Sequence, residues 1–176
     1  MIPWQGGGSV RAASDNKGAR ILLDAAWSGN VEVIRESLSA GVDVDVQDKE
    51  GRTGLVIAAR RGHADVVRLL LDNGAHADSR TRYGTTALMH AAEKGHIDIV
   101  RLVLENGADA NARAEAGLTA LMLAAEHGYL DTVKALLNSG ADVNAKTISG
   151  ATALWLATKN NHADIMKLLA DAGAIK

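Results

Sequence analysis

The sequence contains no cysteine, no phenylalanine and only one proline in 176 residues. Without cysteine, the chain has no disulfide bonds and no thiolate ligands for a metal ion. Aromatic residues make up only 3% of the chain, although 47% of its residues are apolar. Alanine, leucine and valine must therefore fill the core, and small side chains at the contacts allow helices to pack closely.

The sequence also lacks a strong net charge and long apolar runs. The formal net charge is −2, which argues against a general nucleic-acid or membrane-surface binder. No apolar run approaches the roughly 20 residues of a membrane-spanning helix. The N-terminus shows no basic region followed by an apolar one, as a signal peptide would. We therefore expect a cytoplasmic location, and neither nucleic acid nor membrane as a partner.

The sequence has, instead, a repeat with a period of 33 residues. Gly-Thr-Thr-Ala-Leu-Met-His-Ala-Ala begins at Gly84, and Gly-Leu-Thr-Ala-Leu-Met-Leu-Ala-Ala begins at Gly117. Three series keep this offset along the chain: Gly51, Gly84, Gly117 and Gly150; Thr53, Thr86, Thr119 and Thr152; and Gly41, Gly74, Gly107, Gly140 and Gly173. A period between about 20 and 50 residues predicts an array of stacked units.

These motifs resemble the ankyrin repeat family, whose unit of about 33 residues contains a Thr-Pro-Leu-His turn, Ala-Ala, Gly-His and Gly-Ala-Asp. The resemblance covers residues 18–176. The proline and the histidine of the turn are replaced by Gly54, Ala87, Ala120 and Ala153 and by Val56, Met89, Met122 and Trp155. Proline at the first position of a helix only sets φ in advance. Its loss is therefore expected to lower stability and to leave the fold intact.

The resemblance implies an all-α ankyrin-repeat solenoid of stacked helix-turn-helix units with short β-hairpin loops. Residues 1–17 are interpreted as a flexible N-terminal leader, and residues 18–176 as the repeat domain. The domain divides into an N-terminal cap at 18–47, repeats at 48–80, 81–113 and 114–146, and a C-terminal cap at 147–176. The aspartate that opens each hairpin in the family is kept only as Asp48, while Thr81, Ala114 and Thr147 replace it elsewhere.

Each unit is predicted to contain an inner helix and a second, outer helix. The inner helix begins after the repeated threonine, whose hydroxyl is a suitable N-cap. It ends at a residue that tolerates a left-handed conformation, namely Gly62, Gly95, Gly128 or Asn161. Leu88, Ala91 and Ala92 share one face of their inner helix. No single helix pair buries such a face alone, so stability is expected to come from stacking.

Three histidines, His63, His96 and His162, share one position of the repeat, and Tyr129 occupies it in the repeat at 114–146. Because stacked helices lie roughly 8–10 Å apart, equivalent histidines do not converge on one metal ion, whose bonds to nitrogen are about 2 Å long. We interpret them as structural, through hydrogen bonds in the turn between the helices. The sequence contains no phosphate loop, His-Glu-x-x-His motif or nucleophile elbow. We expect no enzyme activity, no cofactor and no metal.

His90 and His127 lie outside that shared position, and we expect them on the exposed side of the inner helices. The simpler interpretation is that both are adaptable surface contacts. The alternative is a pH-sensitive contact, because histidine titrates near neutral pH.

Recognition is expected at exposed positions where the repeats differ, because the shared residues build the scaffold. On the inner helices these positions are spaced i, i+3, i+4 and therefore lie on one face. In the ankyrin family they line the concave groove and the hairpin tips that bind protein partners, and the resemblance implies the same here. The candidate partner-binding residues are Trp27, Lys49, Arg52, Ile57, Arg60, Arg61, Arg82, Tyr83, His90, Glu93, Lys94, Leu118, Leu123, Glu126, His127 and Lys159.

Tryptophan, tyrosine and arginine are enriched at interaction hot spots. We therefore expect an arginine-rich cluster, flanked by Trp27 and by Leu118 and Leu123, that binds an acidic segment of a protein partner. Its members are Arg52, Arg60, Arg61, Arg82 and Tyr83. The predicted function is a protein–protein interaction module or scaffold that is monomeric on its own. The alternatives are a regulatory or accessory subunit of an enzyme or transporter, and an engineered ankyrin scaffold with no native partner.

Overall fold

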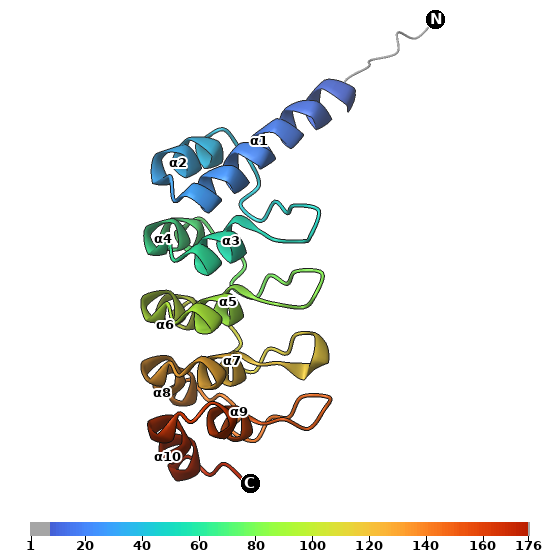
Figure 1. Ribbon diagram of the computed structural model, residues 1–176. Helices are drawn as coiled ribbons and strands as arrows, with labels where there is room; N and C mark the ends of the chain where they lie inside the picture. The colour runs from blue at the N-terminus through green and yellow to red at the C-terminus, as the bar shows by residue number, and fades with distance from the viewer. Residues whose placement is uncertain (1–7, 176) are drawn as a thin grey trace, which may run out of the picture.

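A computed structural model describes residues 8–175 of the chain, and the side chains from Lys17 onward. The described part contains ten α-helices, stacked as five pairs, and no β-strand (Figure 1). An isolated antiparallel bridge joins Gln47 to Thr53 in the first hairpin. The predicted all-α solenoid is confirmed.

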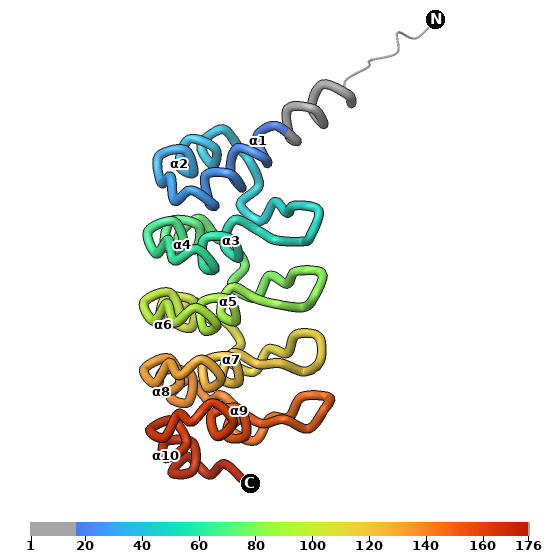
Figure 2. Tube along the Cα trace, in the orientation of Figure 1, coloured from blue at the N-terminus to red at the C-terminus, as the bar shows by residue number. Residues whose placement is uncertain are grey.

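The inner and the outer helices form two parallel layers. The inner layer consists of α1 (Gly8–Ser28), α3 (Gly54–Arg61), α5 (Ala87–Lys94), α7 (Ala120–His127) and α9 (Ala153–Lys159). The outer layer consists of α2 (Val31–Ser39), α4 (Ala64–Asp72), α6 (Ile97–Glu105), α8 (Leu130–Asn138) and α10 (Ala163–Asp171). Each helix packs on its neighbour in the same layer. Four hairpins project from one side of the stack, beyond the inner helices (Figure 2).

The first inner helix differs from the prediction. The N-terminal cap was predicted at 18–47, and α1 begins earlier, at Gly8, within the predicted leader. The sequence between Val10 and Lys17 contains no proline and several good helix formers, so nothing in it stops the helix from extending backwards. The rest of the predicted leader, residues 1–7, lies outside the described residues.

Both ends of the later inner helices follow the predicted capping. A threonine hydroxyl accepts a hydrogen bond at 3.1–3.3 Å from the backbone N–H three residues later, at Thr53, Thr86, Thr119 and Thr152. The helices end at left-handed C-caps, Gly62, Gly95 and Gly128. In the last unit the helix ends with Asn160 as its C-cap, and Asn161 takes the left-handed conformation with φ 60°.

One continuous core runs through the stack. Leu88, Ala91 and Ala92 are buried as predicted, and a single cluster of buried apolar residues extends from Leu22 to Leu169. Every unit contributes a face to this cluster. Helices of seven to nine residues are therefore stable in the stack, although helices shorter than about 12–15 residues are marginal in isolation.

Within the described residues, no helix has the length and apolar character needed to cross a membrane.

The shared histidine position is explained by contact with the preceding unit. Each ring packs on the glycine that ends the preceding inner helix: a Cβ on Gly62 would lie 2.8 Å from the ring of His96, and one on Gly95 would lie 2.6 Å from that of Tyr129. The Nε2 atoms of His63 and His162 donate to the carbonyls of Trp27 and Glu126, each at 3.0 Å. The position is structural, but these hydrogen bonds link neighbouring units instead of closing the local turn.

Candidate functional site

The candidate site is the surface that we call the inner face: residues 17–28, 47–61, 80–94, 113–127 and 146–160, which form the inner helices and the hairpins (Figure 1). Backbone hydrogen bonds connect the hairpins to one another. The N–H groups of Arg82, Glu115 and Ile148 donate to the carbonyls of Glu50, Tyr83 and Ala116, at 3.0, 3.0 and 2.8 Å. The hairpin tips therefore form one connected edge, which holds their exposed side chains at fixed spacing.

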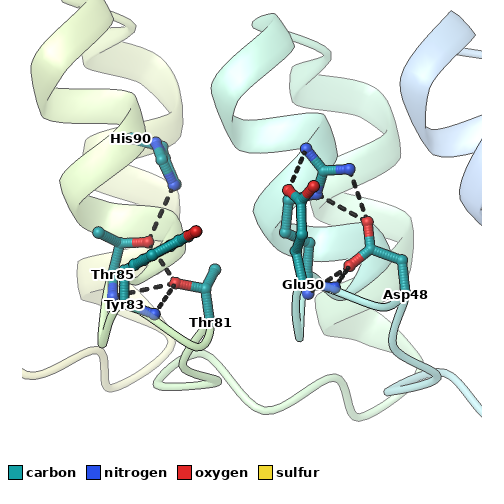
Figure 3. A network of polar contacts seen from close by, with 7 residues as sticks. Asp48, Glu50, Thr81, Tyr83, Thr85 and His90 are labelled. Carbon is teal, nitrogen blue, oxygen red and sulfur yellow. Dashed lines mark hydrogen bonds and ion pairs between the residues drawn. The ribbon is translucent and has the colours of Figure 1, made fainter.

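The first hairpin is closed by Asp48, as Figure 3 shows. Its Oδ1 accepts the backbone N–H groups of Glu50 and Arg52 at 2.8 and 2.9 Å, and its Oδ2 accepts from the Arg52 side chain at 2.7 Å. Burial raises the pKa of Asp48, but the N–H groups and the guanidinium of Arg52 outweigh burial and hold this pKa below its usual value. The Arg52 guanidinium also pairs with Glu50 at 3.1 Å. Arg52 is therefore half-buried and engaged within its own hairpin, and is not the free cation that we expected.

The second hairpin uses a hydroxyl where the first uses a carboxylate (Figure 3). Thr81 Oγ1 accepts the backbone N–H groups of Tyr83 and Thr85 at 3.3 and 3.2 Å. The Thr85 hydroxyl lies 2.6 Å from the Thr81 hydroxyl and 3.2 Å from Nε2 of His90. Threonine therefore replaces aspartate without loss of the hairpin.

The third hairpin has no side-chain acceptor at the equivalent position, Ala114. Its tip forms a short 3-10 turn, η1 (Glu115–Gly117), in which Ala116 adopts a positive φ of 61°. In the fourth hairpin the Thr147 hydroxyl accepts the N–H of Ala151 at 2.9 Å. The hairpin without a side-chain oxygen at this position is thus the one whose tip contains a non-glycine residue in the left-handed conformation.

His90 is less accessible than predicted. Its side chain is only 14% exposed, and its Nδ1, which lies 3.6 Å from the Glu93 carboxylate, has no hydrogen-bond partner in the described part of the chain. Burial lowers the pKa of His90, and Arg60 and Lys94 act in the same direction, while Glu93 opposes them. The expectation of an exposed His90 was wrong, because the side chain lies between its own helix and the preceding hairpin residue Thr85.

Glu93 and Lys94 form an ion pair at 3.0 Å beside His90. Burial raises the pKa of Glu93, but the Lys94 ammonium outweighs it, so this pKa is lowered.

His127, in contrast, is exposed as predicted. Its ring stacks on that of Tyr129, with the ring centroids 6.0 Å apart, and its Nδ1 donates to the Leu123 carbonyl at 2.9 Å.

Exposed cationic and aromatic side chains gather at the N-terminal half of the inner face. The Arg61 guanidinium lies 4.3 Å from the centroid of the Trp27 ring, and Trp27 is 49% exposed. Arg60 and Arg82 are exposed, and Tyr83 is 59% exposed at its hairpin tip. Among the described residues, no ion pair engages Arg60, Arg61 or Arg82. Three of the predicted arginines are thus available to a partner.

The remaining predicted residues differ in exposure. Lys49 and Lys159 are exposed, while Leu118, Leu123 and Glu126 are half-buried. Ile57 is only 6% exposed and packs in the core, which corrects its assignment as an exposed contact. Ile57 lies on α3, which packs on α1, and its small exposed part lines the hollow described below.

Two features were missed from the sequence. A hollow of about 380 Å³ lies between α1 and the first hairpin, and Arg20 and Leu23 line it together with Trp27 and Lys49. Extending the i, i+3, i+4 series backwards from Trp27 would have pointed to Arg20 and Leu23. Trp155 was treated as a scaffold position, yet it is 52% exposed, with Lys159 Nζ 5.2 Å from its ring centroid.

Charge is divided between the two sides of the molecule. The inner face carries twelve basic residues and six acidic ones: Lys17, Arg20, Lys49, Arg52, Arg60, Arg61, Arg80, Arg82, Lys94, Arg113, Lys146 and Lys159, against Asp24, Asp48, Glu50, Glu93, Glu115 and Glu126. The remaining residues from 29 to 175 carry five basic and fourteen acidic ones: Arg35, Arg68, Arg101, Lys134 and Lys167, against Glu32, Glu36, Asp43, Asp45, Asp65, Asp72, Asp78, Asp98, Glu105, Asp109, Asp131, Asp142, Asp164 and Asp171. A nearly neutral chain therefore has a basic inner face and an acidic outer side.

A family model for ankyrin repeats (three copies) matches residues 22–114 and 106–176. The chain belongs to the ankyrin repeat family. Ankyrin repeats generally mediate protein–protein interactions, and ankyrin repeat proteins are typically non-enzymatic. No curated protein matches the sequence. In the described part of this ankyrin repeat chain, no group of three or more histidine, aspartate or glutamate residues is arranged to hold a metal ion.

Proposed function

We propose that this ankyrin repeat chain is a protein-binding module whose inner face and hairpin tips bind an acidic segment of a partner protein. The observation that carries the proposal is the division of charge. Twelve basic residues against six acidic ones lie on the inner face, whereas the outer side has an excess of acidic residues. Complementary charge steers a partner to the correct face and disfavours docking on the other side.

The exposed side chains of the N-terminal half are suited to recognition. Trp27, Arg61 and Tyr83 are of the types enriched at binding hot spots. The connected hairpin edge and the stacking of Arg61 on Trp27 hold such side chains in place before binding. Little conformational entropy is then lost when a partner docks. The assignment of individual residues to the contact remains part of the proposal.

The proposal is tested by reversing charge on one side of the molecule at a time. The intact chain is used to capture partners from a cell lysate, alongside the double variant Arg60→Glu and Arg82→Glu. The matched control is Arg68→Glu with Arg101→Glu, which makes the same charge change on outer helices. We expect capture to be lost in the inner-face variant, kept in the control, and weakened at high salt because the Debye length shortens.

Capture that is equal in all three proteins would contradict the proposal. A catalytic protein that co-purifies in equal amount would identify the module as the regulatory or accessory subunit of the alternative function. If neither the chain nor the control variant captures any protein, the engineered scaffold without a native partner is the better description. A cytoplasmic location and a monomeric state stay predictions, to be checked by fractionation and by light scattering.

A further inference from the structure

We propose that the hollow between α1 and the first hairpin receives one large apolar side chain of the partner's acidic segment. The inference rests on the proposed function and adds an anchoring residue to it. The hollow measures about 380 Å³, within the roughly 300–1,000 Å³ of typical ligand pockets. It is thus large enough for a leucine or an aromatic side chain.

The floor of the hollow is apolar. Leu23 and Trp27 of α1 line it together with Ile57 of α3. Leu23 and Ile57 pack against the core on their far side. Arg61 lies against the ring of Trp27 at 4.3 Å, which holds the indole in position while half of this residue stays exposed. Burial of apolar surface is favourable, so an apolar side chain of a partner would be stabilised against Leu23 and Trp27.

Charged side chains of both signs line the rest of the hollow, with three basic residues and two acidic ones. Lys49 lines it, is exposed, and takes part in no ion pair among the described residues. Arg52 is neutralised by Asp48 and Glu50 within the hairpin, and Arg20 lies 3.6 Å from Asp24 in an exposed pair. Lys49 is therefore the rim charge that is left for a partner carboxylate, beside the exposed Arg60 and Arg82 of the neighbouring elements.

The position of the hollow follows from the architecture. Every later hairpin is hydrogen-bonded to a preceding one, as Arg82 is to Glu50. Among residues 8–175, which the structure describes, no hairpin precedes the first one, because α1 is the first described element. Within the described residues, no hairpin occupies the space beside α1 where the hollow lies. A partner segment in the hollow would meet both Trp27 and Lys49.

The test uses a random dodecapeptide library displayed on phage and selected against the full chain. We expect the enriched peptides to combine one large apolar residue with at least two carboxylates. Synthetic versions of these peptides are then titrated against Trp27→Ala and Lys49→Glu, two variants at exposed side chains that should leave the fold intact, as checked by thermal unfolding. Binding is expected to weaken at least tenfold in each variant, and by less than twofold in the outer-helix control Lys167→Glu.

Enriched peptides without an apolar residue, or peptides whose affinity is unchanged in Trp27→Ala, would overturn the inference. If such peptides still lose binding in the Arg60→Glu and Arg82→Glu variant, the proposed function stands without the anchor. If no peptide is enriched and no partner is captured from lysate, both proposals fail. Self-association that is lost in Trp27→Ala would show that a second copy fills the hollow, and would also overturn the inference.

Discussion

At the scale of single residues, the place of a histidine along its inner helix determines its exposure. His90 and His127 occupy successive inner helices, yet only His127 is exposed. His90 contacts Thr85 and lies near Glu93, and its Nδ1 is buried without a partner. A buried polar atom without a hydrogen bond is destabilising. The charged form of this imidazole is disfavoured further by burial.

This environment predicts a pH-dependent stability. The pKa of His90 in the folded chain is lowered, chiefly by burial, whereas the unfolded value is about 6.5. The unfolded chain therefore binds more protons as the pH falls below about 6.5, and the free energy of unfolding decreases in this range. The variant His90→Gln should show a shallower decrease, measured by urea unfolding between about pH 7.5 and 5. An unchanged slope would contradict this account.

The comparison must be made between the two proteins at each pH, because other groups also titrate. Asp45 raises the pKa of His76, through a hydrogen bond and through its charge, so His76 contributes with the opposite sign. Around His90 the charged groups are Glu93, Arg60 and Lys94, and none of them is altered in the variant. The His90 charge also lowers the pKa of Glu93, so the difference between the two slopes reports His90 together with its coupling to Glu93.

The glycines that end inner helices are required for two separate reasons. Gly95→Ala would place a residue with a Cβ in a left-handed conformation, with φ of 71°, and would set this atom 2.6 Å from the Tyr129 ring. The left-handed conformation alone costs about 1–2 kcal/mol. We expect Gly95→Ala to lower the free energy of unfolding by more than this amount, measured in urea.

Gly74→Ala is the matched control for the ring contact. Gly74 has a φ of 84°, but no atom lies within 4 Å of the Cβ that would be added. Only the conformational cost of about 1–2 kcal/mol is expected there. Equal losses in the two variants would show that the Tyr129 ring moves aside at no cost.

At the scale of elements, capping determines where the short helices start. Thr119 is buried, and its hydroxyl accepts the backbone N–H of Met122 at 3.3 Å. Thr119→Ala leaves this donor at the helix N-terminus without a partner and is expected to lower stability by about 1–2 kcal/mol. Thermal and urea unfolding measure the change.

Thr119→Ser distinguishes the hydroxyl from the methyl group. Serine keeps the hydrogen-bond acceptor, since it is as good an N-cap as threonine. We expect the serine variant to retain most of the stability that the alanine variant loses. If both variants lose the same amount, packing of the threonine methyl outweighs its hydrogen bond.

At the scale of the whole molecule, stability is a sum over units and their interfaces. The units repeat every 33 residues. After removal of residues 81–113, Thr119 follows Thr53 by 33 residues, as Thr86 does in the full chain, so the repeat register is kept. The shortened chain is expected to fold cooperatively, with a lower unfolding midpoint. The slope of its free energy of unfolding against urea concentration (the m-value) should also be lower, roughly in proportion to the smaller surface that unfolding exposes.

Removal of residues 81–97 is the control, because it takes out an inner helix and breaks the register of the layers. This variant is expected to lose cooperative unfolding, as seen by circular dichroism. If removal of the complete repeat were equally damaging, the stack would not behave as a sum of similar units.

The fold of this protein follows from local signals in the sequence. The threonine N-caps and the glycine C-caps act within three or four residues of their own position, and the 33-residue period repeats them. Helix starts at Ala87 and Ala120, and the core positions Leu88 and Leu121, were therefore predictable. The family resemblance supplied the stacking, and the structure confirmed the all-α solenoid.

The candidate site depended on contacts that no local signal records. Ile57 and His90 were expected to be exposed, but Ile57 lies in the core and His90 lies against Thr85 of its own hairpin. Arg52 is neutralised within a hairpin. The hollow beside Leu23 is formed by residues of α1 and of the first hairpin, which the fold brings side by side. The sequence by itself determined where α3, α5 and α7 begin and end, because their threonine and glycine caps are local. Only the tertiary structure decided which side chains remain free to bind, because burial and ion pairing depend on how the units meet.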